Sequence, residues 1–139
     1  MARSFIDTNV LLYSDDAFDP RKNAVAVDLI ARLRAHQEAV VSIQVLQEYF
    51  VNAVAKLKVD PVVARRRVEL FGRFEVVVPS VDLVLGAIDL QRLHSVSFWD
   101  ALILRAASAG GCEVLLSEDL QAGSTIAGVR IVNPFARSE

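Results

Sequence analysis

The sequence has 139 residues, of which 53% are hydrophobic, and its mean hydropathy of +0.37 argues against an intrinsically disordered protein. No apolar run approaches the roughly 20 residues of a membrane-spanning helix. The formal net charge of −2 and the isoelectric point near 5.7 exclude a protein that is basic overall, as many nucleic-acid-binding domains are.

The N-terminal half of the sequence predicts short strands that alternate with longer helices. In chain order we expect a strand at residues 3–6, a helix after Asp7, a helix at 20–36, a strand at 38–42, and helices at 43–57 and 61–71. Capping side chains precede the last three helices, at Asp19, Ser42 and Asp60. The polar loop at residues 14–19 is too short to separate two domains.

The C-terminal half continues the alternation. We expect a strand at 74–78, helices at 81–94 and 98–110, and strands at 113–117 and 129–132. Strands that alternate with helices indicate a mostly parallel sheet covered on both faces, so the fold class is α/β. We expect one domain over residues 1–139.

Cysteine content and the N-terminal residues bear on the cellular compartment. The N-terminal residues lack the long apolar stretch of a secretory signal. The single cysteine, Cys112, cannot form an internal disulfide, and we expect it to be a buried structural thiol. A cytoplasmic protein fits these features best.

Three acidic residues fall where strands end or helices begin. Asp7 directly follows the first strand, Asp119 follows the strand at 113–117, and Asp100 lies in the first turn of the helix after Ser97. Ligands of an open parallel sheet bind beyond the carboxyl ends of its strands, so we expect these acids on one rim. Taken singly, each has an ordinary alternative role as a helix cap, a helix-dipole charge or a loop acid.

Glu48 is a fourth candidate. It lies between Gln44 and Asn52 on a polar stripe of an otherwise apolar helix. Carboxylates crowded on one rim repel one another, and a hard divalent cation, Mg²⁺ or Mn²⁺, would neutralise them. Because His36 and His94 are isolated and no cysteine cluster exists, zinc is disfavoured. A magnesium site of this kind supports hydrolysis of phosphodiester bonds.

Four segments in this order resemble the motifs of PIN-domain ribonucleases, and specifically of VapC-like toxins of type II toxin–antitoxin systems. The segments are FIDTNVLL, SIQVLQEYF, FWDALILRAA and LLSEDLQAG, the last followed by VRIVNPF. The resemblance extends over nearly the whole chain. It implies a three-layer α/β/α sandwich with a mostly parallel sheet.

The resemblance also implies roles for single residues. It implies that one or two Mg²⁺ or Mn²⁺ ions are held by Asp7, Glu48, Asp100 and Asp119. The expected supporting residues, which hydrogen-bond to these acids, are Thr8, Asn9 and Ser117. Glu118, beside Asp119, is an open alternative for the fourth acid. The implied activity is endoribonuclease cleavage, and the implied partners are RNA, a VapB-like antitoxin that delivers an arginine to the site, and a second copy of the chain.

The run Arg65, Arg66 and Arg67 has two interpretations. The ordinary one is a solvated helix face, and the functional one is a contact for RNA or for acidic residues of an antitoxin. For the antitoxin's apolar contacts, we expect the helix after Ser42 and the helix that holds these arginines. Large apolar side chains in the segments FVNAVAKL and VELFGRF favour a homodimer.

Two other function classes fit parts of this pattern. One is a PIN-like module that binds RNA without cutting it, although all four acids are present. The other is a receiver-type phosphotransfer domain, which needs an Asp after the third strand and a Lys after the last. Here Pro79 follows the third strand and Asn133 follows the last, so this class fits poorly.

Overall fold

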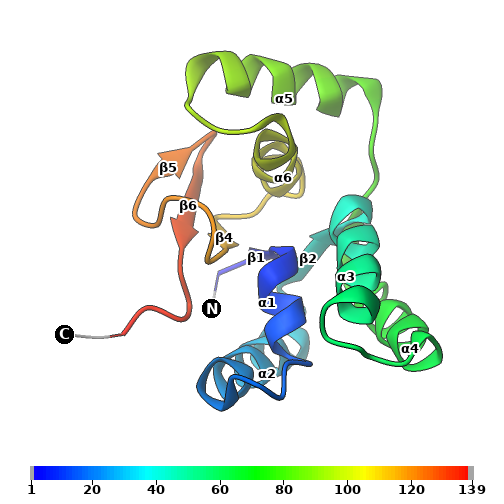
Figure 1. Ribbon diagram of the computed structural model, residues 1–139. Helices are drawn as coiled ribbons and strands as arrows, with labels where there is room; N and C mark the ends of the chain where they lie inside the picture. The colour runs from blue at the N-terminus through cyan, green and yellow to red at the C-terminus, as the bar shows by residue number, and fades with distance from the viewer. Residues whose placement is uncertain (1, 138–139) are drawn as a thin grey trace.

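A six-stranded sheet forms the middle of the molecule (Figure 1). The computed structural model describes residues 2–137. Its strands are β1 (Ser4–Ile6), β2 (Ala39–Ser42), β3 (Glu75–Val77), β4 (Val114–Leu116), β5 (Thr125–Ile126) and β6 (Val129–Val132), in the spatial order β3-β2-β1-β4-β6-β5. All neighbours are parallel except β5 and β6.

Helices cover both faces of this sheet. They are α1 (Thr8–Tyr13), α2 (Pro20–Ala35), α3 (Ile43–Ala55), α4 (Pro61–Phe71), α5 (Val81–Leu93) and α6 (Phe98–Ala109). In Figure 1, α6 and α5 lie on one side of the sheet, and α1 and α2 lie on the other. α6 packs directly on β2, β4 and β6, and α5 packs on α6. The expected α/β/α sandwich is therefore confirmed.

The helices begin where the sequence predicts them to begin. The capping side chains of Asp19, Ser42, Asp60, Ser80 and Ser97 each accept a backbone N–H within the first helical turn, at 2.8–3.3 Å. The helix ends fall one or two residues short of four of the expected ends. Strand β5 was not expected, and it pairs with β6 across a turn at Ala127 and Gly128, both with positive φ.

The core lies on both faces of the central strands. β1, β2 and β4 are buried at every residue, and Phe5 pairs with Val40 on one side and Leu115 on the other. Cys112 is buried as expected, and burial raises the pKa of its thiol to about 11. No helix within residues 2–137 is long and apolar enough to cross a lipid bilayer.

Candidate active site

The carboxyl ends of the central strands bring the sequence-predicted acids onto one rim. Asp7 follows β1 directly, and its backbone N–H donates to the carbonyl of Leu116 at the end of β4 at 3.0 Å. Burial is the largest cause that raises the pKa of Asp7 and of Asp100, and the negative charges of Glu48 and Asp119 raise both further. Asp7 and Asp100 therefore each lie close enough to Glu48 and Asp119 to be affected by their charges. We call Asp7, Glu48, Asp100 and Asp119 the acidic rim.

Asp7 is the most buried member, with 8% of its surface exposed. It also caps α1, because its Oδ1 accepts the backbone N–H of Thr8 at 2.7 Å. Its Oδ2 accepts the Ser117 hydroxyl at 2.8 Å and lies 3.5 Å from the Asn9 amide nitrogen. Burial raises the pKa of Asp7 to about 6, although the bonds from Ser117 and Thr8 oppose this. Asp7 therefore both caps α1 and belongs to the acidic rim.

The three expected supporting residues connect the acids through neutral hydrogen bonds. The Thr8 hydroxyl donates to Glu48 Oε1 at 2.7 Å, and the Asn9 amide donates to Asp119 Oδ2 at 3.0 Å. Ser117, besides its bond to Asp7, accepts the backbone N–H of Asp119 at 3.2 Å. Their geometry therefore fixes the orientation of three carboxylates without neutralising any of them.

Asp100 stands in the first turn of α6 and is partly buried. Burial is the largest cause that raises its pKa, and the bond to Ser97 opposes the shift. Gln44 was not expected among the site residues. Its amide nitrogen lies 3.4 Å from both Glu48 Oε2 and the Trp99 carbonyl, and so links α3 to the start of α6. The signal for it was its place four residues before Glu48.

Glu118 and Asp119 have different surroundings despite their adjacency. Glu118 accepts the Tyr13 hydroxyl at 2.7 Å and pairs with the Lys22 ammonium at 2.5 Å. Asp119 is exposed and bonds to Asn9 instead. Glu118 is thus neutralised by a protein cation, which favours Asp119 as the fourth rim acid.

The rim fits a hard divalent cation by its chemistry. Within residues 2–137, no lysine, arginine or histidine forms an ion pair with a rim acid. In the same range, no three acidic, histidine or cysteine side chains are close enough together to form a ready-made metal site. Like charges repel, so a cation would have to draw these carboxylates inward. His36 and His94 end α2 and α5 and are not part of the rim.

The run of three arginines does not form one surface. Arg65 and Arg66 are exposed and both pair with Glu69, at 2.5 and 2.9 Å. Arg67 turns inward, where its guanidinium donates to Asp15 at 3.1 Å and lies 4.7 Å from the centre of the Phe71 ring. Arg67 therefore has a structural role that its two neighbours lack.

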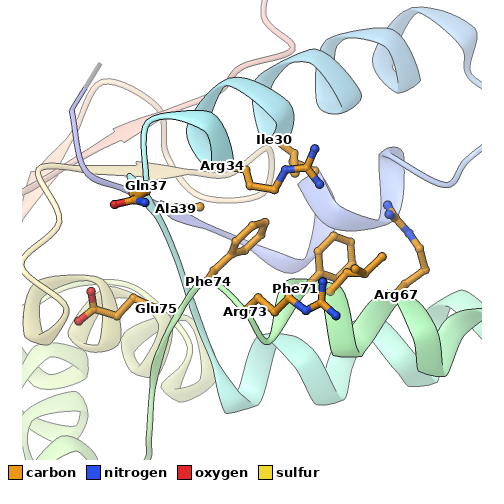
Figure 2. Close-up of a pocket in the computed structure, with 10 residues that line it drawn as sticks. Ile30, Arg34, Gln37, Ala39, Arg67, Phe71, Arg73, Phe74 and Glu75 are labelled. Atoms are coloured by element: carbon orange, nitrogen blue, oxygen red, sulfur yellow. The ribbon is translucent and has the colours of Figure 1, made fainter.

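A groove runs between α2 and α4 (Figure 2). Its cavity has a volume of about 440 Å³. Two phenylalanines, Phe71 and Phe74, lie among three arginines there, Arg34, Arg67 and Arg73, and Ile30 also lines the groove. Among the described ion pairs, Arg34 and Arg73 have no acidic partner, so two of the groove's positive charges are uncompensated. We call this the arginine groove.

The PIN-domain family model matches residues 4–124 of the chain. The chain belongs to the PIN-domain family. No curated protein sequence matches it significantly. Solved structures with a similar fold do match it.

Those structures share the fold at low sequence identity. VapC20 of Mycobacterium tuberculosis, described as a toxin that cleaves the sarcin–ricin loop, is 23% identical with a TM-score of 0.65, over 84% of this chain and 91% of that one. A toxin–antitoxin complex from Klebsiella pneumoniae is 21% identical with a TM-score of 0.69, over 94% and 97%. DNA-bound VapBC from Salmonella typhimurium is 20% identical with a TM-score of 0.67, over the same shares.

Proposed function

We propose that this PIN domain is a metal-dependent endoribonuclease that acts as the toxin of a toxin–antitoxin pair in the cytoplasm. The observation that carries the proposal is the acidic rim: neutral donors orient three of its carboxylates, and within residues 2–137 no cationic side chain pairs with any of the four. Leaving charges unpaired is costly unless a ligand compensates them. Similarity in fold to solved toxins and toxin–antitoxin complexes supports the same conclusion.

The rim residues would work as follows. Asp7, Glu48, Asp100 and Asp119 would hold Mg²⁺ or Mn²⁺, which supplies an activated water and stabilises charge on the leaving oxygen of the phosphodiester. Ser117 and Thr8 keep the Asp7 carboxylate in one orientation, and Thr8 does the same for Glu48. Asp7 must be deprotonated to act as a ligand. In the metal-free protein its pKa is about 6, so protons would compete with the metal for this carboxylate at and below that pH.

We propose the arginine groove as the docking surface of the antitoxin. The sequence analysis expected the helix after Ser42 and the helix of Arg65 to Arg67. The second of these is α4, which forms the groove together with α2, whereas the helix after Ser42 does not line it. The partly exposed Phe74 ring would take an apolar side chain, and Arg34 and Arg73 would take acidic ones. An arginine of the antitoxin would pair with the rim acids and displace the metal.

A homodimer is part of the same proposal. In the segments expected to mediate it, Val51 is 62% exposed, whereas Phe71 is buried. The most exposed apolar helix face is that of α5, with Val81 at 75%, Leu85 at 53% and Ile88 at 40%. Pairing of two α5 faces would cover these side chains. A monomer mass in light scattering at micromolar concentration would count against it.

The decisive experiment is a cleavage assay on total RNA with added Mg²⁺. Wild type should cut, whereas Asp7→Asn, Asp100→Asn and wild type in excess chelator should not. Asp28→Asn is the matched control, because Asp28 is an exposed acid on α2 that pairs only with Arg32. If either rim variant still cleaved RNA, the proposed metal site would be wrong. Binding of RNA by wild type without cleavage would identify a non-catalytic module instead.

A further inference from the structure

Trp99 is exposed where a tryptophan is usually covered. It is 63% exposed, occupies the second position of α6, and directly precedes the rim acid Asp100. Its ring meets Phe98 edge-to-face with 5.3 Å between ring centres. The neighbouring aromatic ring therefore limits its freedom while leaving much of the indole open to solvent.

A small hollow adjoins this indole. It has a volume of about 200 Å³ and lies between α3, α5 and α6. Its lining includes Ile43, Gln44, Gln47, Pro79 and Leu83. Sites for whole small molecules usually measure about 300–1,000 Å³, so this hollow suits one planar ring system better than a complete cofactor.

The hollow adjoins the acidic rim through Gln44. Gln44 lines the hollow, and its amide nitrogen lies 3.4 Å from Glu48 Oε2 and from the Trp99 carbonyl. The side-chain amides of Gln44 and Gln47 can donate and accept hydrogen bonds. One end of the hollow is thus polar and next to the proposed scissile phosphate, while its walls are apolar.

We propose that Trp99 and this hollow form a subsite for one unstacked base of single-stranded RNA beside the phosphate that is cut. The proposal rests on the proposed function. Proteins recognise single-stranded RNA by stacking splayed bases on aromatic side chains and by bonding to their edges. The indole would supply the stacking surface, and the Gln47 amide together with the amide oxygen of Gln44 would face the base edge.

A second copy of the chain is the competing occupant. Val84 lines the hollow and belongs to the exposed apolar part of α5. The base is favoured because the hollow is small, carries two amides and abuts the rim, whereas an interface between copies would need a broad apolar surface.

The test uses the fact that Trp99 is the only tryptophan in the chain. Short single-stranded RNA oligonucleotides are titrated into Asp7→Asn protein, which should bind without cutting, and tryptophan emission is followed. Stacking should quench the emission. Trp99→Leu in the same background should weaken binding about 5- to 150-fold without changing its salt dependence, because stacking releases no counterions. Trp99→Phe should weaken RNA binding less than Trp99→Leu does.

Two controls separate the possible outcomes. Phe18→Leu alters another exposed aromatic, 89% exposed in the loop before α2, and should leave RNA affinity unchanged. A series of oligonucleotides, each abasic at one position, is then tested. At a single position, removing the base should weaken binding to protein that keeps Trp99 but should not weaken binding to Trp99→Leu any further. Emission that responds to protein concentration and not to RNA would assign the hollow to a second copy and overturn the proposal.

The failure of this inference differs from failure of the proposed function. If wild type cuts RNA while Trp99→Leu keeps the same affinity and the same cleavage sites, only the base subsite is wrong. If wild type cuts no RNA under any metal condition, the ribonuclease proposal is wrong.

Discussion

Asp7 and Asp15 flank the same short helix, α1, but their surroundings are opposite. Among the described residues, those that donate to Asp7 are neutral: Thr8, Ser117 and, at 3.5 Å, Asn9. Asp15 accepts the Tyr49 hydroxyl and pairs with the Arg67 guanidinium. The same contrast separates Asp119 from Glu118, one residue apart, since only Glu118 has a lysine partner.

The contrast distinguishes acids that hold the fold together from acids left available to a ligand. A partly buried carboxylate that already has a cation has little to gain from a metal ion. A carboxylate oriented by hydroxyl and amide groups keeps its charge uncompensated and its geometry fixed, which is the state a cation can exploit. The predictions below test this division.

The largest expected effect separates the adjacent pair. Asp119→Asn should reduce RNA cleavage at least as strongly as the roughly 10- to 100-fold typical of residues that only support a metal ligand. Glu118→Gln should leave cleavage within a fewfold of wild type and instead cost about 1 kcal/mol of the free energy of unfolding, because Lys22 loses its partner. Cleavage rates and urea unfolding of both variants measure the two effects. The reverse pattern would move the fourth acid to Glu118.

The next effect is on stability alone. Arg67→Met should lower the free energy of unfolding by about 2–3 kcal/mol, because it leaves the Asp15 charge 20% exposed and without a cation. Arg66→Met is the matched control, since Arg66 is 57% exposed and pairs only with Glu69 at the surface. Urea denaturation compares them, and equal losses in the two variants would contradict the inward role of Arg67.

Asp7 gives a pH-dependent effect in metal-free protein. Its pKa rises from 3.8 to about 6 on folding, so the folded state binds the proton more tightly, and stability falls as the pH rises from about 4 to 6. Asp7→Asn removes this loss. Above pH 6 the free energy of unfolding of the variant should therefore exceed that of wild type by up to about 3 kcal/mol, and this difference should vanish near pH 4. Thermal unfolding across this range, with Asp28→Asn as control, measures it. A gain that persists at pH 4 would refute the assigned cause.

The smallest effect concerns the exposed arginines. Replacing both Arg65 and Arg66 by Ala should change the free energy of unfolding by no more than about 0.5 kcal/mol. If these residues meet acidic groups of the antitoxin, the double variant should bind it more slowly at low salt with little change in final affinity. Stopped-flow association across salt concentrations tests this. An unchanged rate would leave the two residues as a solvated helix face.

Local features of the fold were predictable because local chemistry decides them. Ser42, Ser80 and Ser97 cap helices through bonds to residues three positions later, so the sequence alone indicates the helix starts. Strand β5 was not predictable from residue preference, since its two residues become a strand only by pairing with β6. The spatial order of the strands also depends on contacts between distant residues.

The candidate site shows the same limit. The sequence placed three acids at strand ends or helix starts and a fourth, Glu48, on the polar stripe of a helix, and the structure brings all four onto one rim. The sequence alone could not distinguish the role of Glu118 from that of Asp119, because Lys22, the partner of Glu118, lies 96 residues away from it in the chain. Likewise, three consecutive arginines look alike in sequence, but successive helical residues point in different directions, and only Arg67 faces Asp15.

The central position of β1 has a consequence for how the protein is made. β1 is synthesised first, yet its partner β4 and the residues Ser117 and Asp119 come more than a hundred positions later, as the separation of 110 between Asp7 and Ser117 shows. A nascent chain folds from its N-terminus as it emerges, but the β1–β4 pairing cannot close until β4 is available. The proposed nuclease centre therefore stays incomplete until β4, Ser117 and Asp119 have been translated, more than a hundred residues after β1.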